Sequence, residues 1–162
     1  MAVAPSEDDQ GAPKTIPWSE FARLEPELAR FGAERLIAAP AYLATIRRSG
    51  LPRVHPVTPI LSPRGLFLFM EPTSPKARDL EERAWFALHN GVPDNAGSGG
   101  EFNVSGQGFG RADPGLWAHV AEAAGYTPLD RYILFELQVS EARCHGYGDV
   151  PIPSSRSWKV GK

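Results

Sequence analysis

The triplet Ser74-Pro75-Lys76 has the residue types and spacing that most strongly suggest chemistry in this sequence. Serine followed by proline is typical of a helix start, where free backbone N–H groups and the helix dipole attract anions. A cation in the first turn costs about 0.3–1 kcal/mol against that dipole, unless an anion lies beside it. Ser74 and Lys76 therefore suggest a small phosphate-binding site. The triplet alone favours the alternative, an ordinary capped helix whose lysine is solvated or paired with Asp79 or Glu82.

The stretch Arg53–Leu61 has the composition of an apolar strand that two prolines interrupt. Because proline cannot donate to a sheet ladder, Pro56 and Pro59 indicate an edge, a bulge or an outward turn. Such an interruption exposes backbone groups that the polar edge of a flat heterocycle could use, and protection of a sheet edge explains it as well. No histidine or carboxylate stands at a metal-ligand spacing from His55, so we predict no metal site.

Three glycines alternate with larger residues near the middle of the chain, in the sequence "VSGQGFGR". With a period of two, Gly106, Gly108 and Gly110 share one face of a strand and Gln107 lies on the other. The spacing differs from that of a dinucleotide-binding loop, and no helix follows directly. Glycines along one face of a strand indicate a bend or the close approach of another group, and this structural interpretation is favoured.

The elements that must position these residues alternate between helical and strand patterns. Apolar residues at helical spacing (Phe21, Leu24, Leu28, Phe31 and Leu36) predict helices over 18–39, which Pro26 divides. We expect strands at 41–48, 53–61, 65–70, 84–90, 101–111 and 132–147, a short helix opening at Ser74, and a helix capped by Asp113. About six strands joined mainly by tight turns indicate an antiparallel sheet curled toward a barrel.

Composition limits the class of protein. The chain of 162 residues is long enough for one domain with a core, and its net charge of −2 argues against a nucleic-acid partner. No apolar run has the length of a membrane helix, and Cys144 is the only cysteine. The acidic start is not a secretory signal, so we expect a cytoplasmic protein. We expect a disordered tail at 1–17, a barrel domain at 18–147 and an irregular tail at 148–162.

The order of these parts resembles the pyridoxamine 5′-phosphate oxidase-like family over roughly Leu36 to Val139. The resemblance runs from "YLATIRRSGLPRVHPVTPIL" through "GLFLFMEPTSPKARDLEERAWFALH". It implies a mainly β fold, an FMN-binding split β-barrel of about six antiparallel strands with peripheral helices. It also implies a homodimer that holds each flavin in a groove between subunits, with oxidoreductase activity on a small-molecule substrate that the sequence does not identify.

Carried over by position, the family's cofactor site falls on nine residues. Ser74 and Lys76 would hold the cofactor phosphate. The ring would be lined, largely through backbone atoms, by His55, Pro56, Val57 and Thr58. Met70 and Glu71 would lie beside the ring and ribityl chain, and Gln107 would come from the fifth expected strand, in the same subunit or across the dimer. We name no catalytic acid or base, because the flavin would carry the chemistry.

The sequence departs from the family pattern in three places. His55 stands where the true oxidases carry a basic residue, and Pro75 stands where a second basic residue usually precedes the lysine. The C-terminal tail has Arg156 and Trp158 but lacks the substrate-binding pattern of the oxidases. Three alternatives therefore stay open: a deazaflavin-dependent reductase on the same fold, a non-catalytic flavin- or haem-binding protein, and a barrel that serves only as an interaction module.

Overall fold

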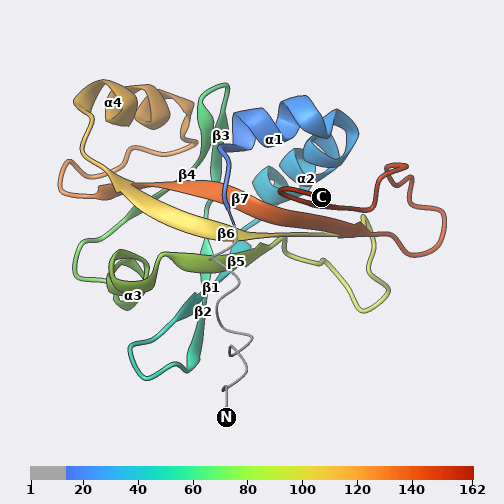
Figure 1. Ribbon diagram of the computed structural model, residues 1–162, viewed down its shortest axis with the longest axis horizontal. Helices are drawn as coiled ribbons and strands as arrows, with labels where there is room; N and C mark the ends of the chain where they lie inside the picture. The colour runs from blue at the N-terminus through green and yellow to red at the C-terminus, as the bar shows by residue number, and fades with distance from the viewer. Residues whose placement is uncertain (1–13) are drawn as a thin grey trace, which may run out of the picture.

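The computed structural model describes residues 14–162, which form four helices and eight strands (Figure 1). The helices are α1 (Trp18–Leu24), α2 (Pro26–Ala38), α3 (Pro75–Arg83) and α4 (Pro114–Ala123). The strands are β1 (Ala41–Ile46), β2 (Pro52–Val57), β3 (Ile60–Ser62), β4 (Gly65–Met70), β5 (Trp85–His89), β6 (Glu101–Arg111), β7 (Ile133–His145) and β8 (Ser157–Lys159). No helix in residues 14–162 is both long enough and apolar enough to cross a membrane.

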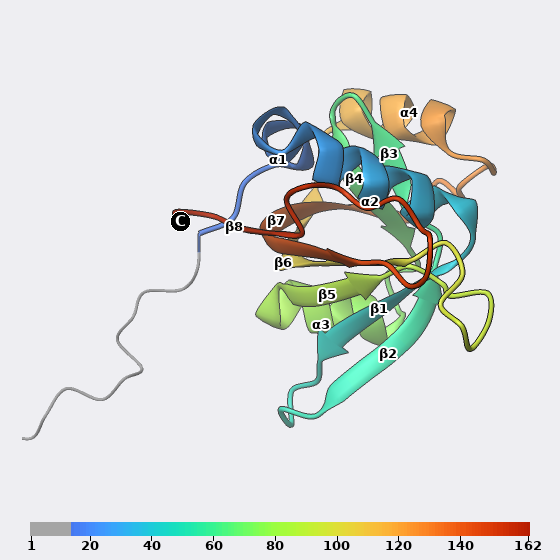
Figure 2. The ribbon, with the colours of Figure 1, turned by 90° about the vertical axis from the view of Figure 1, so that its right-hand side faces the viewer.

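All eight strands belong to one antiparallel sheet with the order β2-β1-β5-β6-β7-β4-β3, and β8 adds to β7. The outer strands β2 and β3 lie at opposite ends of this order, yet only Thr58 and Pro59 separate them in the chain. A two-residue link can join the two edges only if the sheet curls until they meet. Figure 2 shows this curl from the side, from β6 and β7 round to β1 and β2.

The predicted strand 53–61 is therefore two strands rather than one, and the physical reason is proline. Pro59 lacks the N–H that would continue the ladder, so pairing with β1 stops at Val57 and pairing with β4 begins at Ile60. The C-terminal tail also differs from the expectation of irregular structure, because β8 pairs with β7. The expectation for residues 1–13 lies outside the described residues, but Ile16 pairs with Val139.

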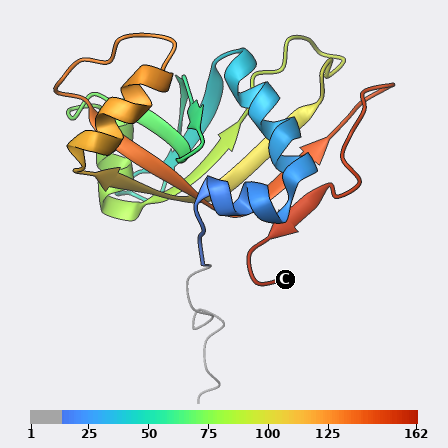
Figure 3. The same ribbon diagram turned by 90° about the horizontal axis from the view of Figure 1, so that it is seen from above.

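The helices pack on the two ends of the curled sheet. Pro26 divides the first predicted helix into α1 and α2, as expected, because its ring and missing N–H start a new helix. Figure 3 shows α1 and α2 crossing one end of the molecule and α4 covering the other. Asp113 caps α4 as predicted, with its side chain accepting from the backbone N–H of Leu116 at 3.1 Å.

Two apolar clusters hold these layers together. The larger one fills the barrel. The apolar residues that predicted α1 and α2 are buried in it, except Leu24, which is exposed. The smaller one lies under α4, where Leu116 and Val120 pack on Phe67, Phe69 and Leu134. Burying each such side chain contributes roughly 1.5–3 kcal/mol. Because the two clusters are separate, α4 and the pair α1–α2 are each held on the sheet by apolar contacts of their own.

Two of the three glycines of β6, Gly106 and Gly108, serve close packing, which is the structural interpretation favoured above. A β-carbon on Gly106 would lie only 1.8 Å from the backbone oxygen of Gln138, beside a bulge between β6 and β7. A β-carbon on Gly108 would touch Leu80 of α3 at 3.2 Å. The N–H of Gly108 also donates to the carbonyl of Ala84 at 2.7 Å. These contacts bring α3 against the sheet and thereby fix the position of its N-terminus.

Candidate anion-binding site at the start of helix α3

The start of α3 has the features that the sequence predicted for it. Ser74 is the N-cap, and its hydroxyl accepts a long hydrogen bond of 3.4 Å from the N–H of Ala77. Pro75 is the first helical residue, and the first turn contains no acidic side chain. The partial positive charge of this helix end is therefore not offset by a neighbouring carboxylate on the same turn.

Lys76 does not form the ion pairs that its spacing along the helix offers. Asp79 is bound to Arg53 at 2.8 Å, and Glu82 is bound to Arg83 at 2.8 Å. Within residues 14–162, no carboxylate lies within ion-pair distance of the Lys76 ammonium group. The pairing of Lys76 with Asp79 or Glu82 is thus not formed, and of the alternative drawn from the triplet the capped helix with a solvated lysine is left. The lysine stays available to an anion.

His55 lies on β2 close to this helix end and has an unsatisfied ring nitrogen. Its side chain is half-buried, and its Nε2 atom is buried without a hydrogen-bond partner among the described residues. Burial lowers the pKa of His55, and the positive charges of Lys76, Arg53 and Arg47 lower it further, while Asp79 opposes them. A buried polar nitrogen without a partner costs about 1–3 kcal/mol, so an anion that accepted from it would relieve that cost.

Arg53 belongs to the same group, although the sequence analysis did not select it. Arg53 and His55 alternate along β2 and therefore face the same side, opposite Thr45 and Leu43 of β1. The Nε of Arg53 donates to Asp79, and its side chain is only 24% exposed. The alternation of the two basic residues in "RVH" was the signal that could have found it. The group of Arg53, His55, Ser74 and Lys76 is called the α3 cation cluster below.

The remaining predicted residues lie in different surroundings. The side chains of Val57 and Met70 are buried in the larger core cluster, and Met70 is only 2% exposed. Glu71 forms an ion pair with Arg131 at 2.8 Å. Pro56 and Thr58 are exposed. In a single chain, any ligand contact from Val57 or Met70 would therefore have to come from backbone atoms.

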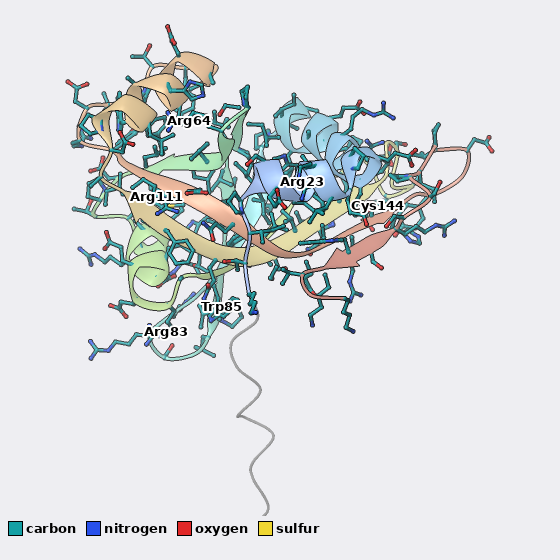
Figure 4. All side chains as sticks on the ribbon, turned by 45° about the horizontal axis from the view of Figure 1, so that its top comes forward. Arg23, Arg64, Arg83, Trp85, Arg111 and Cys144 are labelled. Carbon is teal, nitrogen blue, oxygen red and sulfur yellow. The ribbon has the colours of Figure 1, made fainter. Side chains whose placement is uncertain are left out.

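Gln107 is not brought together with the α3 cation cluster within one chain. It lies on the row of β6 opposite to the glycines, paired with Trp85 of β5 and Gln138 of β7. The glycine row faces α3, so Gln107 faces away from it. Figure 4 shows Trp85, the neighbour of Gln107, on the lower side of the sheet, away from α1 and α2.

Several hollows of the surface lie away from the α3 cation cluster. One of about 390 Å³ lies beside α4 and is lined by Arg111 and Trp117. Another, of about 620 Å³, lies between α2 and the C-terminal residues Pro151–Ser154. Within residues 14–162, no group of three or more His, Cys, Asp or Glu side chains is arranged to hold a metal ion. The cluster therefore offers hydrogen-bonding groups and positive charge rather than a set of metal ligands.

Comparison with known proteins identifies the fold. No family model and no curated protein matches the sequence. Among solved structures, the haem storage protein HutZ from Vibrio cholerae is similar, with a TM-score of 0.59 and 23% identity over 77% of this chain and 96% of that one. A haem-binding protein from Mycobacterium smegmatis has a TM-score of 0.62 and 19% identity over 80% of this chain, which spans 57% of its length.

A third similar structure carries the name of an oxidase. A protein from Listeria innocua, provisionally named a pyridoxamine 5′-phosphate oxidase, has a TM-score of 0.58 and 11% identity over 75% of this chain and 97% of its own. Identities this low show the fold alone. The chain is thus a mainly β protein with a split-barrel-like fold, as predicted, and proteins named for haem and for pyridoxamine 5′-phosphate oxidation share this fold.

Proposed function

We propose that this protein binds FMN and serves as a flavin-dependent oxidoreductase. The observation that carries the proposal is the α3 cation cluster, in which the unpaired charge of Lys76 and the unsatisfied ring nitrogen of His55 lie beside a helix N-terminus. Phosphate is the anion that best uses such a set, because it accepts several charge-assisted hydrogen bonds at once. Neither the cofactor nor the reaction follows from the fold.

Each member of the cluster would have a separate part in holding the phosphate. Lys76 supplies a full charge whose cost against the helix dipole the phosphate removes. Ser74 supplies a hydroxyl group, Arg53 its terminal guanidinium nitrogens, and His55 its buried Nε2. When bound, FMN supplies hydride or electron transfer, and the protein supplies binding and electrostatics. The substrate and the electron donor are not specified by these residues.

The cofactor would complete its site across a homodimer. Gln107 faces away from the α3 cation cluster of its own chain, so a ring contact from this residue requires a second copy. We therefore propose that each flavin lies between two subunits, as the resemblance to the oxidase-like family implies.

Haem is the second candidate ligand, and the comparisons favour it. Two of the similar structures described above carry haem in their names. In such a protein, the α3 cation cluster would bind a haem propionate instead of a phosphate, because both are anions that accept from Lys and Arg. In that case the protein would bind haem without catalysing an oxidation or reduction.

Titration of the purified protein with FMN, riboflavin and haemin tests these proposals. We expect FMN to bind with micromolar or better affinity and Lys76→Ala to weaken FMN binding by more than about 1 kcal/mol, or about fivefold. Riboflavin lacks the phosphate, so its affinity should not respond to this change. Arg78→Ala, on the exposed side of the same helix, is the matched control.

The other outcomes are equally informative. Unchanged FMN affinity in Lys76→Ala would contradict the phosphate site. Tight haemin binding without FMN binding would favour the second candidate. Binding of a deazaflavin in place of both would indicate a deazaflavin-dependent reductase, and absence of all three would leave only an interaction module.

A further inference from the structure

Asp79 is a buried acidic residue whose contacts link three elements around the α3 cation cluster. It lies on α3 and is 8% exposed. Its Oδ2 atom accepts from Thr45 Oγ1 of β1 at 2.8 Å and from Arg53 Nε of β2 at 2.8 Å. Thr45 and Arg53 are direct partners across β1 and β2. A single carboxylate oxygen thus ties the helix to both strands.

The position of this contact relates it directly to the cluster. Asp79 follows Lys76 by three residues, which is about one helical turn. Arg53 precedes His55 by two residues and lies on the same face of β2. The Asp79–Arg53 pair therefore lies next to the Lys76–His55 end of the site. The hydrogen bonds of residues 14–162 include none from the terminal guanidinium nitrogens of Arg53.

We infer that Asp79 is a positioning residue, which holds Arg53 by its Nε and directs the terminal nitrogens of Arg53 toward a phosphate at the start of α3. The inference rests on the proposed function. An arginine side chain has many rotamers, and restraining it before the ligand arrives removes an entropic cost of binding. Because the guanidinium group is a rigid planar fork, fixing one nitrogen also orients the others. Arg53 would then supply, from a strand, the second cation that Pro75 cannot supply from the helix.

The competing explanation is that the pair only ties α3 to the sheet. The two explanations predict opposite signs for a change of Asp79 to asparagine. A carboxylate close to a bound phosphate repels it, so removing that charge alone should strengthen FMN binding. If Asp79 acts by positioning Arg53, the loss of the charged anchor should weaken FMN binding instead.

The experiment measures dissociation constants for FMN and riboflavin in wild type and variants. We expect Asp79→Asn to weaken FMN binding by about fivefold or more and to leave riboflavin binding within about twofold. Arg53→Met should cause a similar loss, and adding Asp79→Asn to it should have little further effect, because Asp79 acts through Arg53. Glu81→Gln makes the same charge change at an exposed site of α3 and is the matched control.

Thr45→Val keeps the inference testable if Asp79→Asn does not fold, because it removes one donor to Asp79 and leaves every charge in place. It should weaken FMN binding in the same direction by a smaller factor. Unchanged or tighter FMN binding in folded Asp79→Asn or Thr45→Val would overturn the positioning role while leaving the proposed function intact. Wild-type protein that binds no FMN would overturn both.

Discussion

At the scale of single residues, the cation cluster illustrates what local sequence can and cannot give. The helix start at Ser74-Pro75-Lys76 follows from propensity and capping rules, and it is confirmed. The partner of Asp79 does not follow from those rules. Helical spacing offers Lys76 as its neighbour, whereas the fold brings Arg53 from a strand 26 residues away. Arg53 was missed for the same reason, since its part in the site depends on how α3 packs against β1 and β2.

The titration of His55 gives a prediction at this scale. Its pKa is lowered in the folded chain by burial first and then by Lys76, Arg53 and Arg47, with Asp79 acting in the other direction. Below a pH of about 6.5 the unfolded chain takes up a proton that folded His55 does not. The free energy of unfolding therefore has its full contribution from the neutral ring of His55 above that pH. This contribution is lost as the pH falls from about 6.5 toward the lower pKa of the folded chain.

Urea unfolding of wild type and His55→Gln at a series of pH values between about 5 and 7.5 measures this contribution. We expect the free energy of unfolding to fall more steeply toward acid pH in wild type than in His55→Gln, because glutamine does not titrate. Parallel pH profiles for the two proteins would show that His55 is not held neutral by its surroundings.

At the scale of elements, the alternation of apolar and polar residues predicted most strands of the sheet. The prolines predicted that a strand is interrupted, but they did not predict where the chain goes after the interruption. The prolines of "RVHPVTPIL" predicted an edge or an interruption, and both descriptions hold, since β2 and β3 are the two edges of the order. That the chain crosses from one edge to the other between Val57 and Ile60 could not be predicted. It depends on the curl of the whole sheet, which no local pattern encodes.

The glycines of β6 allow a sharp test of close packing. A β-carbon on Gly106 would lie 1.8 Å from a backbone oxygen, which cannot move as a side chain can, whereas one on Gly110 would meet its nearest atom at 3.8 Å. We expect Gly106→Ala to lower the free energy of unfolding by about 2 kcal/mol or more. Gly110→Ala should stay within about 1 kcal/mol of wild type, because alanine lowers the entropy of the unfolded chain without a clash. Equal effects in denaturant unfolding would contradict this account of β6.

At the scale of the whole molecule, the outer face of the sheet carries exposed apolar side chains where β1, β2 and β5 lie. Tyr42, Ile46 and Val54 project from β1 and β2 on this face and are exposed. Trp85 of β5 lies on the same side and lines a shallow hollow of about 220 Å³ with Ile46. Contiguous apolar patches of this kind mark interaction sites on proteins of this size. Gln107, the predicted ring contact, is the neighbour of Trp85 on β6, so a partner bound here would lie against it.

We expect this face to bind a second copy of the chain. A variant that introduces a charged side chain on the face tests that expectation. Val54→Glu introduces a carboxylate on the face at a residue that is 61% exposed in the single chain, and Ile37→Glu introduces one at 63% exposure on α2. The two changes cost the single chain about the same, because both side chains are largely in water. Burying the new carboxylate between two subunits costs several kcal/mol, so only Val54→Glu should convert a dimer to a monomer. Light scattering measures the mass, and FMN titration of the same samples shows whether cofactor affinity is lost together with the dimer. A monomeric wild type would overturn the dimer and remove Gln107 from the site. Two variants that behave alike would place the contact between the subunits on another face.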